Sequence, residues 1–92
     1  MVIIEIVVLT VWFFMKLLVR NLSRTTTEQD IATLFSTHGT VSACDLVLDQ
    51  KTNESKGFAF VEMPKEDEAK AAIENLHETR LAKNRIRVKI AQ

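Results

Sequence analysis

The chain has 92 residues, which is enough for one domain and too short for a second hydrophobic core. Hydrophobic residues make up 47% and charged residues 26%, with two Gly and one Pro, and this composition excludes collagen-like and disordered chains. Twelve Lys and Arg balance twelve Asp and Glu, so nucleic-acid binding would require positive and negative charges to be segregated on different faces.

The N-terminal segment is apolar from Val2 to Met15 except for Glu5 and Thr10. A membrane-spanning helix needs about 20 apolar residues, and this run is shorter. A secretory signal would begin with a basic region, which is missing here. We therefore expect no membrane span and a cytoplasmic location, or a nuclear one in a eukaryote.

Three interpretations of residues 1–15 remain open. The segment is an upstream extension without a role in the fold, or a membrane or partner anchor, which the absence of a charged face disfavours. Alternatively it is an added helix or strand that packs on the domain or joins two chains in a homo-oligomer, because such apolar segments aggregate when exposed. In that case Trp12, Phe13 or Phe14 would cover the aromatic residues described below. Deletion of residues 1–14 should leave folding and binding intact under the first interpretation, whereas a large loss of stability or conversion of a dimer to a monomer would favour the added element.

From Lys16 onward, apolar residues alternate between a period of two, typical of strands, and a period near 3.6, typical of helices. Thr27 and Asp30 resemble a capping box at the start of the first helix, and Pro64 followed by three acidic residues indicates the start of the second. The predicted elements are a strand over residues 17–21, a helix from 27 to near 39, strands over 41–48 and 58–63, a helix from about 66 to 76, and a strand over 85–90.

The order βαββαβ predicts an α+β fold for residues 16–92, a ferredoxin-like sandwich with the apolar N-terminal extension, residues 1–15, ahead of it. Two helices would cover one face of a four-stranded antiparallel sheet. The first and third strands would lie side by side at its centre. The other face of the sheet would stay open, and side chains from the two central strands would form its middle.

Alternation in the third strand predicts which side chains reach the open face. If Ala59, Val61 and Met63 face the helices, Phe58 and Phe60 must face outward. Exposed rings on a rigid sheet can stack on unpaired bases, each stack contributing roughly 1 to 3 kcal/mol. Burial of both rings in the core is the alternative.

Two segments carry a family resemblance. Lys56-Gly57-Phe58-Ala59-Phe60-Val61-Glu62-Met63 fits the octapeptide K/R-G-F/Y-G/A-F-V-x-F/Y at every place except the last, and Leu17-Leu18-Val19-Arg20-Asn21-Leu22 is similar to its companion hexapeptide. The chain from Lys16 to Gln92 thus resembles the RNA recognition motif family, in particular its small single-domain members. The resemblance implies that Phe60 stacks on a base, that Phe58 packs against a sugar or a neighbouring base, and that Lys56 meets a phosphate.

Alternation places further residues beside the rings, and the candidate RNA-binding set is Lys16, Leu18, Arg20, Lys56, Phe58, Phe60, Arg85, Arg87 and Lys89. Six acidic residues fall on the predicted helices, so we expect a basic sheet face and an acidic helix face, unless these are ordinary solvated strands. The acidic set is Glu28, Asp30, Glu66, Asp67, Glu68 and Glu74. Leu18 stands where the family usually has a stacking aromatic residue, which predicts weaker or shorter-site binding.

The sequence therefore predicts non-catalytic binding of single-stranded RNA, with single-stranded DNA left open as a ligand. The alternative is a protein-interaction module of the same fold, which Leu18 and the neutral net charge favour. No catalytic grouping, phosphate-binding glycine loop or zinc signature is present, so we expect no enzyme activity, metal, cofactor or small-molecule substrate. The lone Cys44 fits a reducing compartment and a buried, unreactive thiol.

Overall fold

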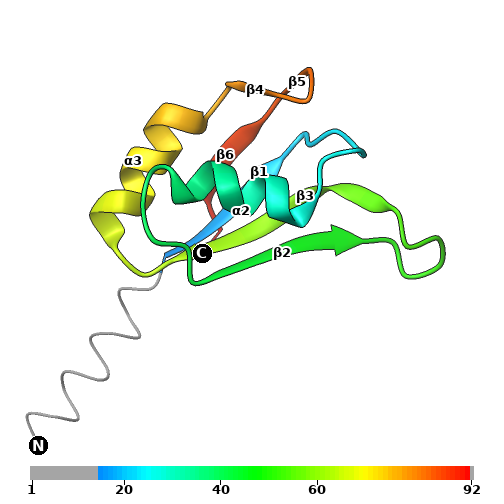
Figure 1. The fold of residues 1–92 in the computed structure, drawn as a ribbon, viewed down its shortest axis with the longest axis horizontal. Coiled ribbons are helices and arrows are strands. Elements are labelled where there is room, and N and C mark those ends of the chain that lie inside the picture. Colours follow the sequence, from blue (N-terminus) through cyan, green and yellow to red (C-terminus); the bar gives the residue numbers. More distant parts are fainter. Residues whose placement is uncertain (1–14, 92) are drawn as a thin grey trace, which may run out of the picture.

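A computed structural model describes residues 15–91 of the chain. In chain order its elements are β1 (Met15–Arg20), α2 (Glu28–Ser36), β2 (Ala43–Leu48), β3 (Ser55–Met63), α3 (Glu66–Leu76), β4 (Arg80–Leu81), β5 (Asn84–Arg85) and β6 (Arg87–Ile90). The helices α2 and α3 lie on the same side of the main sheet (Figure 1). The predicted α+β fold is confirmed.

The main sheet has the strand order β2-β3-β1-β6, and every neighbouring pair in it is antiparallel. β1 and β3 occupy its centre, as the βαββαβ order predicts. Each central strand therefore has a hydrogen-bonded neighbour on both sides, which holds its backbone in place. Side chains that project from β1 and β3 away from the helices are therefore attached to a rigid backbone.

The core lies between the sheet and the helices. Leu17 and Val19 of β1 are fully buried there, as are Val61 and Met63 of β3, and Phe35 of α2 packs against them. The strand residues are separated by two positions, the spacing that puts them on one face. The predicted inward set of β3, which also includes Ala59, is confirmed.

The capping box at the start of α2 is confirmed. The Asp30 backbone N–H donates to Thr27 Oγ1 at 3.1 Å, and the Thr27 N–H donates to Asp30 Oδ2 at 3.0 Å. These two bonds satisfy backbone donors that the first turn of a helix leaves unpaired. The polar stretch before α2 thus ends at Thr27, and Ile31 and Phe35 follow one turn apart on the buried side.

The last predicted strand is divided. We expected Arg85 to share one strand with Arg87 and Lys89, but Arg85 belongs to β5, which pairs with β4 in a separate short hairpin. Ala82 and Lys83 form the turn of this hairpin with positive φ values of 51° and 72°. Of the two strands formed by residues 84–90, β6 joins the main sheet and β5 does not. The expected position of Arg85 on the sheet face is therefore wrong.

The boundaries of three other strands also differ from expectation. Met15, which we grouped with the N-terminal extension, is buried as the first residue of β1 and pairs with Met63. β3 begins at Ser55 instead of residue 58, and β2 at Ala43 instead of residue 41. Residues 1–14 lie outside the described part of the chain, so the three interpretations of the N-terminal extension stay predictions. Within residues 15–91, no helix is long and apolar enough to cross a membrane.

Candidate nucleic-acid interface

The two phenylalanine rings of β3 stand on the helix-free face of the sheet. Phe58 and Phe60 are each half-buried, while their neighbours Ala59 and Val61 are fully buried on the other side. The ring centroids lie 6.1 Å apart with an interplanar angle of 88°, an edge-to-face contact. Such a contact stabilises the pair while leaving one ring face of each free of the other ring. The predicted outward orientation of both rings is therefore seen in the structure.

An open depression of about 340 Å³ lies beside these rings. Leu18 and Arg20 of β1 line it together with Phe58 and Phe60. Leu18 pairs with Phe60 across the β1–β3 ladder, so the two side chains share the same face. Three of its four lining residues are apolar and the fourth is an arginine, a combination suited to a flat base with an attached phosphate.

Lys16 contacts the second ring directly. Its Nζ atom lies 5.0 Å from the centroid of the Phe60 ring, within the range of a cation–π interaction. Lys16 pairs with Glu62 across the ladder, so β1 supplies a cation at the end of the aromatic surface. Lys16 and Phe60 therefore share the open face of the sheet, as alternation predicts.

Gly57 and Asn21 shape the ends of the two central strands. Gly57 has a φ of +84°, a left-handed conformation that side chains disfavour, and its carbonyl accepts the Leu22 N–H at 2.9 Å. Asn21, with a φ of 60°, donates from Nδ2 to the Arg85 carbonyl at 2.8 Å. Asn21 thus ties the end of β1 to the β5 segment.

Basic residues of the face lie on the neighbouring strands β1 and β6. Arg20 of β1 stands directly opposite Arg87 of β6, and Leu18 stands opposite Lys89. Lys56 is exposed near the start of β3. Like charges placed directly opposite each other repel, and among residues 15–91 neither arginine has an ion-pair partner. An anion bound between Arg20 and Arg87 would relieve that repulsion.

Two acidic residues on the sheet face were not predicted from the sequence. The register puts Asp45 of β2 opposite Phe60, and Glu62 lies two residues beyond Phe60 on the same side of β3. The sheet face is therefore not purely basic as expected, although the two carboxylates are outnumbered by the cations Lys16, Arg20, Lys56, Arg87 and Lys89. Alternation along β3 could have found Glu62. The position of Asp45 opposite Phe60 could not be predicted, because it depends on the register between β2 and β3.

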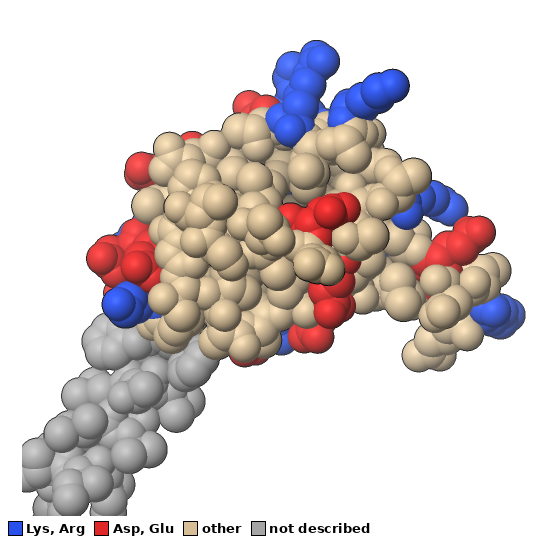
Figure 2. All heavy atoms as spheres, in the orientation of Figure 1, with Lys and Arg blue, Asp and Glu red and all other residues tan. Residues whose placement is uncertain are grey.

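The helices carry the acidic residues that the sequence assigned to them. Three of these fill the first turn of α3 and two lie in the first turn of α2. On the side of the molecule seen in Figure 2, acidic side chains form several patches, and most visible Lys and Arg extend from the periphery. Lys70 of α3 forms an exposed ion pair with Glu66 at 3.1 Å.

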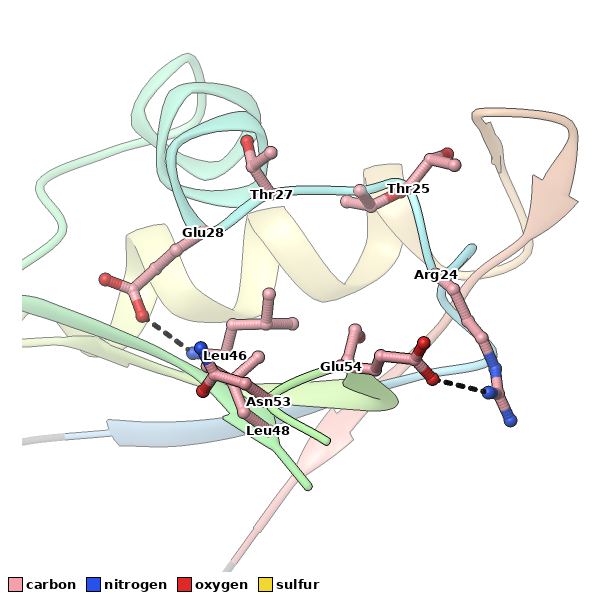
Figure 3. Close-up of a pocket in the computed structure, with 10 residues that line it drawn as sticks. Arg24, Thr25, Thr27, Glu28, Leu46, Leu48, Asn53 and Glu54 are labelled. Carbon is pink, nitrogen blue, oxygen red and sulfur yellow. Dashed lines mark hydrogen bonds and ion pairs between the residues drawn. The ribbon is translucent and has the colours of Figure 1, made fainter. Parts of the chain in front are cut away.

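A second hollow, of about 500 Å³, contains none of the predicted RNA-binding residues. It lies between the start of α2 and the β2–β3 hairpin (Figure 3). Glu28 Oε2 accepts the Leu46 backbone N–H at 3.0 Å there, and Arg24 pairs with Glu54 at 3.7 Å. Because Leu46 donates from an edge strand, the Glu28 carboxylate satisfies a group that would otherwise be free to pair with another chain.

Cys44 is half-buried next to this region, and its thiol lies 3.7 Å from the Glu28 carbonyl oxygen. Burial, with smaller contributions from the carboxylates of Glu28 and Asp45, raises the pKa of the Cys44 thiol to about 11. The thiol is therefore protonated at neutral pH and a poor nucleophile. Across residues 15–91, no group of three or more metal-ligating side chains occurs.

Comparison with known proteins identifies the relatives of this chain. The sequence model of the RNA recognition motif matches residues 17–87. A glycine-rich RNA-binding protein 1 of Mycosarcoma maydis is 42% identical over 76 residues, covering 83% of this chain and 43% of the relative. The human Transformer-2 protein homolog alpha is 43% identical over 68 residues, covering 74% of this chain and 24% of the relative. The chain thus spans less than half the length of either protein.

Solved structures agree with the sequence comparison. The crystal structure of an RNA binding protein designated PG1 superimposes with a TM-score of 0.82 at 35% identity, covering 84% of this chain and 93% of that one. A Sex-lethal protein in complex with RNA superimposes with a TM-score of 0.81 at 29% identity, covering 85% and 47%. The motif match over most of the chain, its conserved sheet topology and its aromatic pair together show that this protein belongs to the RNA recognition motif family.

Proposed function

We propose that the domain binds single-stranded RNA on the open face of its sheet, without catalysis. The observation that carries the proposal is the pair of half-buried rings, Phe58 and Phe60, on the face opposite the helices. In this function Phe60 stacks on one base and Phe58 packs against an adjacent sugar or base. RNA binding by the named relatives, one of them solved with RNA, supports the same assignment.

Phosphate contacts would come from the basic side chains around the rings. Arg20 of β1 and Arg87 of β6 stand opposite each other on adjacent strands, and their like charges repel. A phosphate between them would accept a charge-assisted hydrogen bond from each. Lys56 lies on β3, the strand that carries the rings, and Lys89 lies on β6, opposite Leu18 of β1. Both would contact the backbone of the RNA. Arg85 would contribute from the β4–β5 hairpin, beyond the edge of the sheet proper.

The direct test is titration of short unstructured RNA into the protein at low salt. Phe60→Ala should weaken binding by about 1 to 3 kcal/mol, because it removes the surface on which a base would stack. The same oligonucleotide made of DNA would show whether the site needs the 2′-hydroxyl. Circular dichroism would check that the variant keeps its fold.

Salt dependence tests the phosphate contacts separately. Each lost contact to single-stranded RNA should flatten the slope of log affinity against log salt by about 0.7. Arg87→Ala should therefore flatten it, whereas Lys70→Ala should not, because Lys70 lies on α3 and pairs with Glu66. Absence of binding by the folded domain at low salt would overturn the proposal and favour the alternative, a protein-interaction module.

A further inference from the structure

Asp45 is the acidic residue closest in the sheet to the ring proposed to stack on a base. It stands directly opposite Phe60 in the β2–β3 ladder, so both side chains leave the same face. The Asp45 side chain is exposed, and in residues 15–91 it takes part in no hydrogen bond or ion pair. Its carboxylate is therefore free to accept hydrogen bonds from a ligand.

The position of β2 explains why, within residues 15–91, no cation forms an ion pair with Asp45. β2 is the edge strand of the main sheet, so Asp45 has a neighbouring strand only on the side of Phe60. Glu62, the other acidic residue of the face, differs because Lys16 stands opposite it. Asp45 thus borders the aromatic surface with an unneutralised carboxylate.

A base stacked on the Phe60 ring would turn its edge toward the strands that flank the ring. On one side it would meet Leu18, which is apolar, and on the other Asp45. An ionised carboxylate has two acceptor oxygens and no donor. Guanine alone offers two adjacent donors on its Watson–Crick edge, N1–H and N2–H, whereas adenine and cytosine place an acceptor beside their amino group and uracil has a single N–H between two carbonyls.

We propose that Asp45 makes the Phe60 site select guanine, by accepting two parallel hydrogen bonds from its Watson–Crick edge. The inference rests on the proposed binding of RNA at the open face and assigns a base preference to that site. Removing the carboxylate would have opposite effects on two ligands. Guanine recognition would be lost, while uridine-only RNA would bind more tightly because one negative charge leaves a phosphate-binding face.

The test is a double-mutant cycle between protein and RNA. The ligands are a short oligouridine with one central guanosine and the same oligonucleotide with inosine there, since inosine lacks only the N2 amino group. The wild-type protein should bind the guanosine ligand about tenfold more tightly than the inosine ligand, a typical discrimination for a paired carboxylate or amide contact. Asp45→Ala should bind the two with equal affinity.

Two further variants sharpen the test. Asp45→Asn presents one acceptor and one donor, so it cannot accept from N1–H and N2–H together and should bind the guanosine and inosine ligands with nearly equal affinity. Glu74→Ala removes the same charge from the exposed surface of α3 and should keep the preference of the wild type. Binding of all ligands with an unchanged guanosine-to-inosine ratio in Asp45→Ala would overturn the base preference alone, whereas no binding of any ligand would overturn the proposed function.

Discussion

Replacing Leu18 by Phe should convert the open face into one with three adjacent rings. Leu18 faces outward from the central strand β1, between Phe60 on one side and Lys89 on the other. It also lines the depression of about 340 Å³ beside the rings, which offers room for a larger side chain without disturbing the core. The variant should therefore fold like the wild type and present one more surface for a base.

The magnitude follows from the value of a single stack. A base–aromatic stack contributes about 1 to 3 kcal/mol by alanine substitution, and the existing leucine already supplies part of that apolar contact. A gain of about 1 to 2 kcal/mol corresponds to roughly 5- to 30-fold tighter binding. Leu18→Ala, which removes apolar surface without a ring, should weaken binding by less than Phe60→Ala does.

Fluorescence anisotropy with a labelled, unstructured oligonucleotide measures these affinities at one salt concentration. The oligonucleotide must be long enough to reach β1 and β3 together, because a third ring adds nothing for a ligand that covers only the first two. If Leu18→Phe keeps its fold and binds such RNA no more tightly than the wild type, then bases do not pass over β1. The proposed path of the RNA across the two central strands would then be refuted.

The other predictions concern stability and reactivity. Gly57→Ala should lower the free energy of unfolding by about 1 to 2 kcal/mol, measured by urea denaturation, because the residue keeps a φ of +84° and the new Cβ would lie 3.3 Å from the Leu22 carbonyl. An unchanged unfolding curve would contradict that strain. Cys44 should react with iodoacetamide at pH 8 about 10- to 100-fold more slowly in the folded protein than in urea, because its pKa is raised from 9.0 to about 11. Equal labelling rates in the folded and unfolded protein would show that the thiol is not shielded. The unfolded chain loses the Cys44 thiol proton at a lower pH than the folded protein does, so the free energy of unfolding should also fall as the pH rises from 9.0 towards 11.

Much of this domain could be predicted from local patterns. Alternation in residues 58–63 assigned the inward and outward side chains of β3, and the structure keeps each of them on the expected side. The spacing of Thr27 and Asp30 located the start of α2 to the residue. These features depend on contacts between residues close in sequence, or on a period of two that holds wherever the strand is placed.

Other features depended on the tertiary structure. The opposition of Arg20 to Arg87, and of Asp45 to Phe60, follows from the register of strands far apart in the chain. A period of two tells which face a side chain takes but not which residue stands beside it. The same limit hid the displacement of Arg85, because β5 pairs with β4 across the turn at Ala82 and Lys83 and not with the main sheet, although alternation continues from Arg85 into β6.

The amino-acid sequence by itself determined the order of elements, the family and the aromatic pair on the open face, since these follow from periodicity and a short motif. Only the tertiary structure decided which charges surround that pair. The pairing of the edge strand β2 with β3 put a carboxylate next to Phe60, and no local pattern in an apolar strand could have signalled it. The physical reason is that strand register is set by hydrogen bonds and packing across the sheet, between residues that the sequence keeps apart.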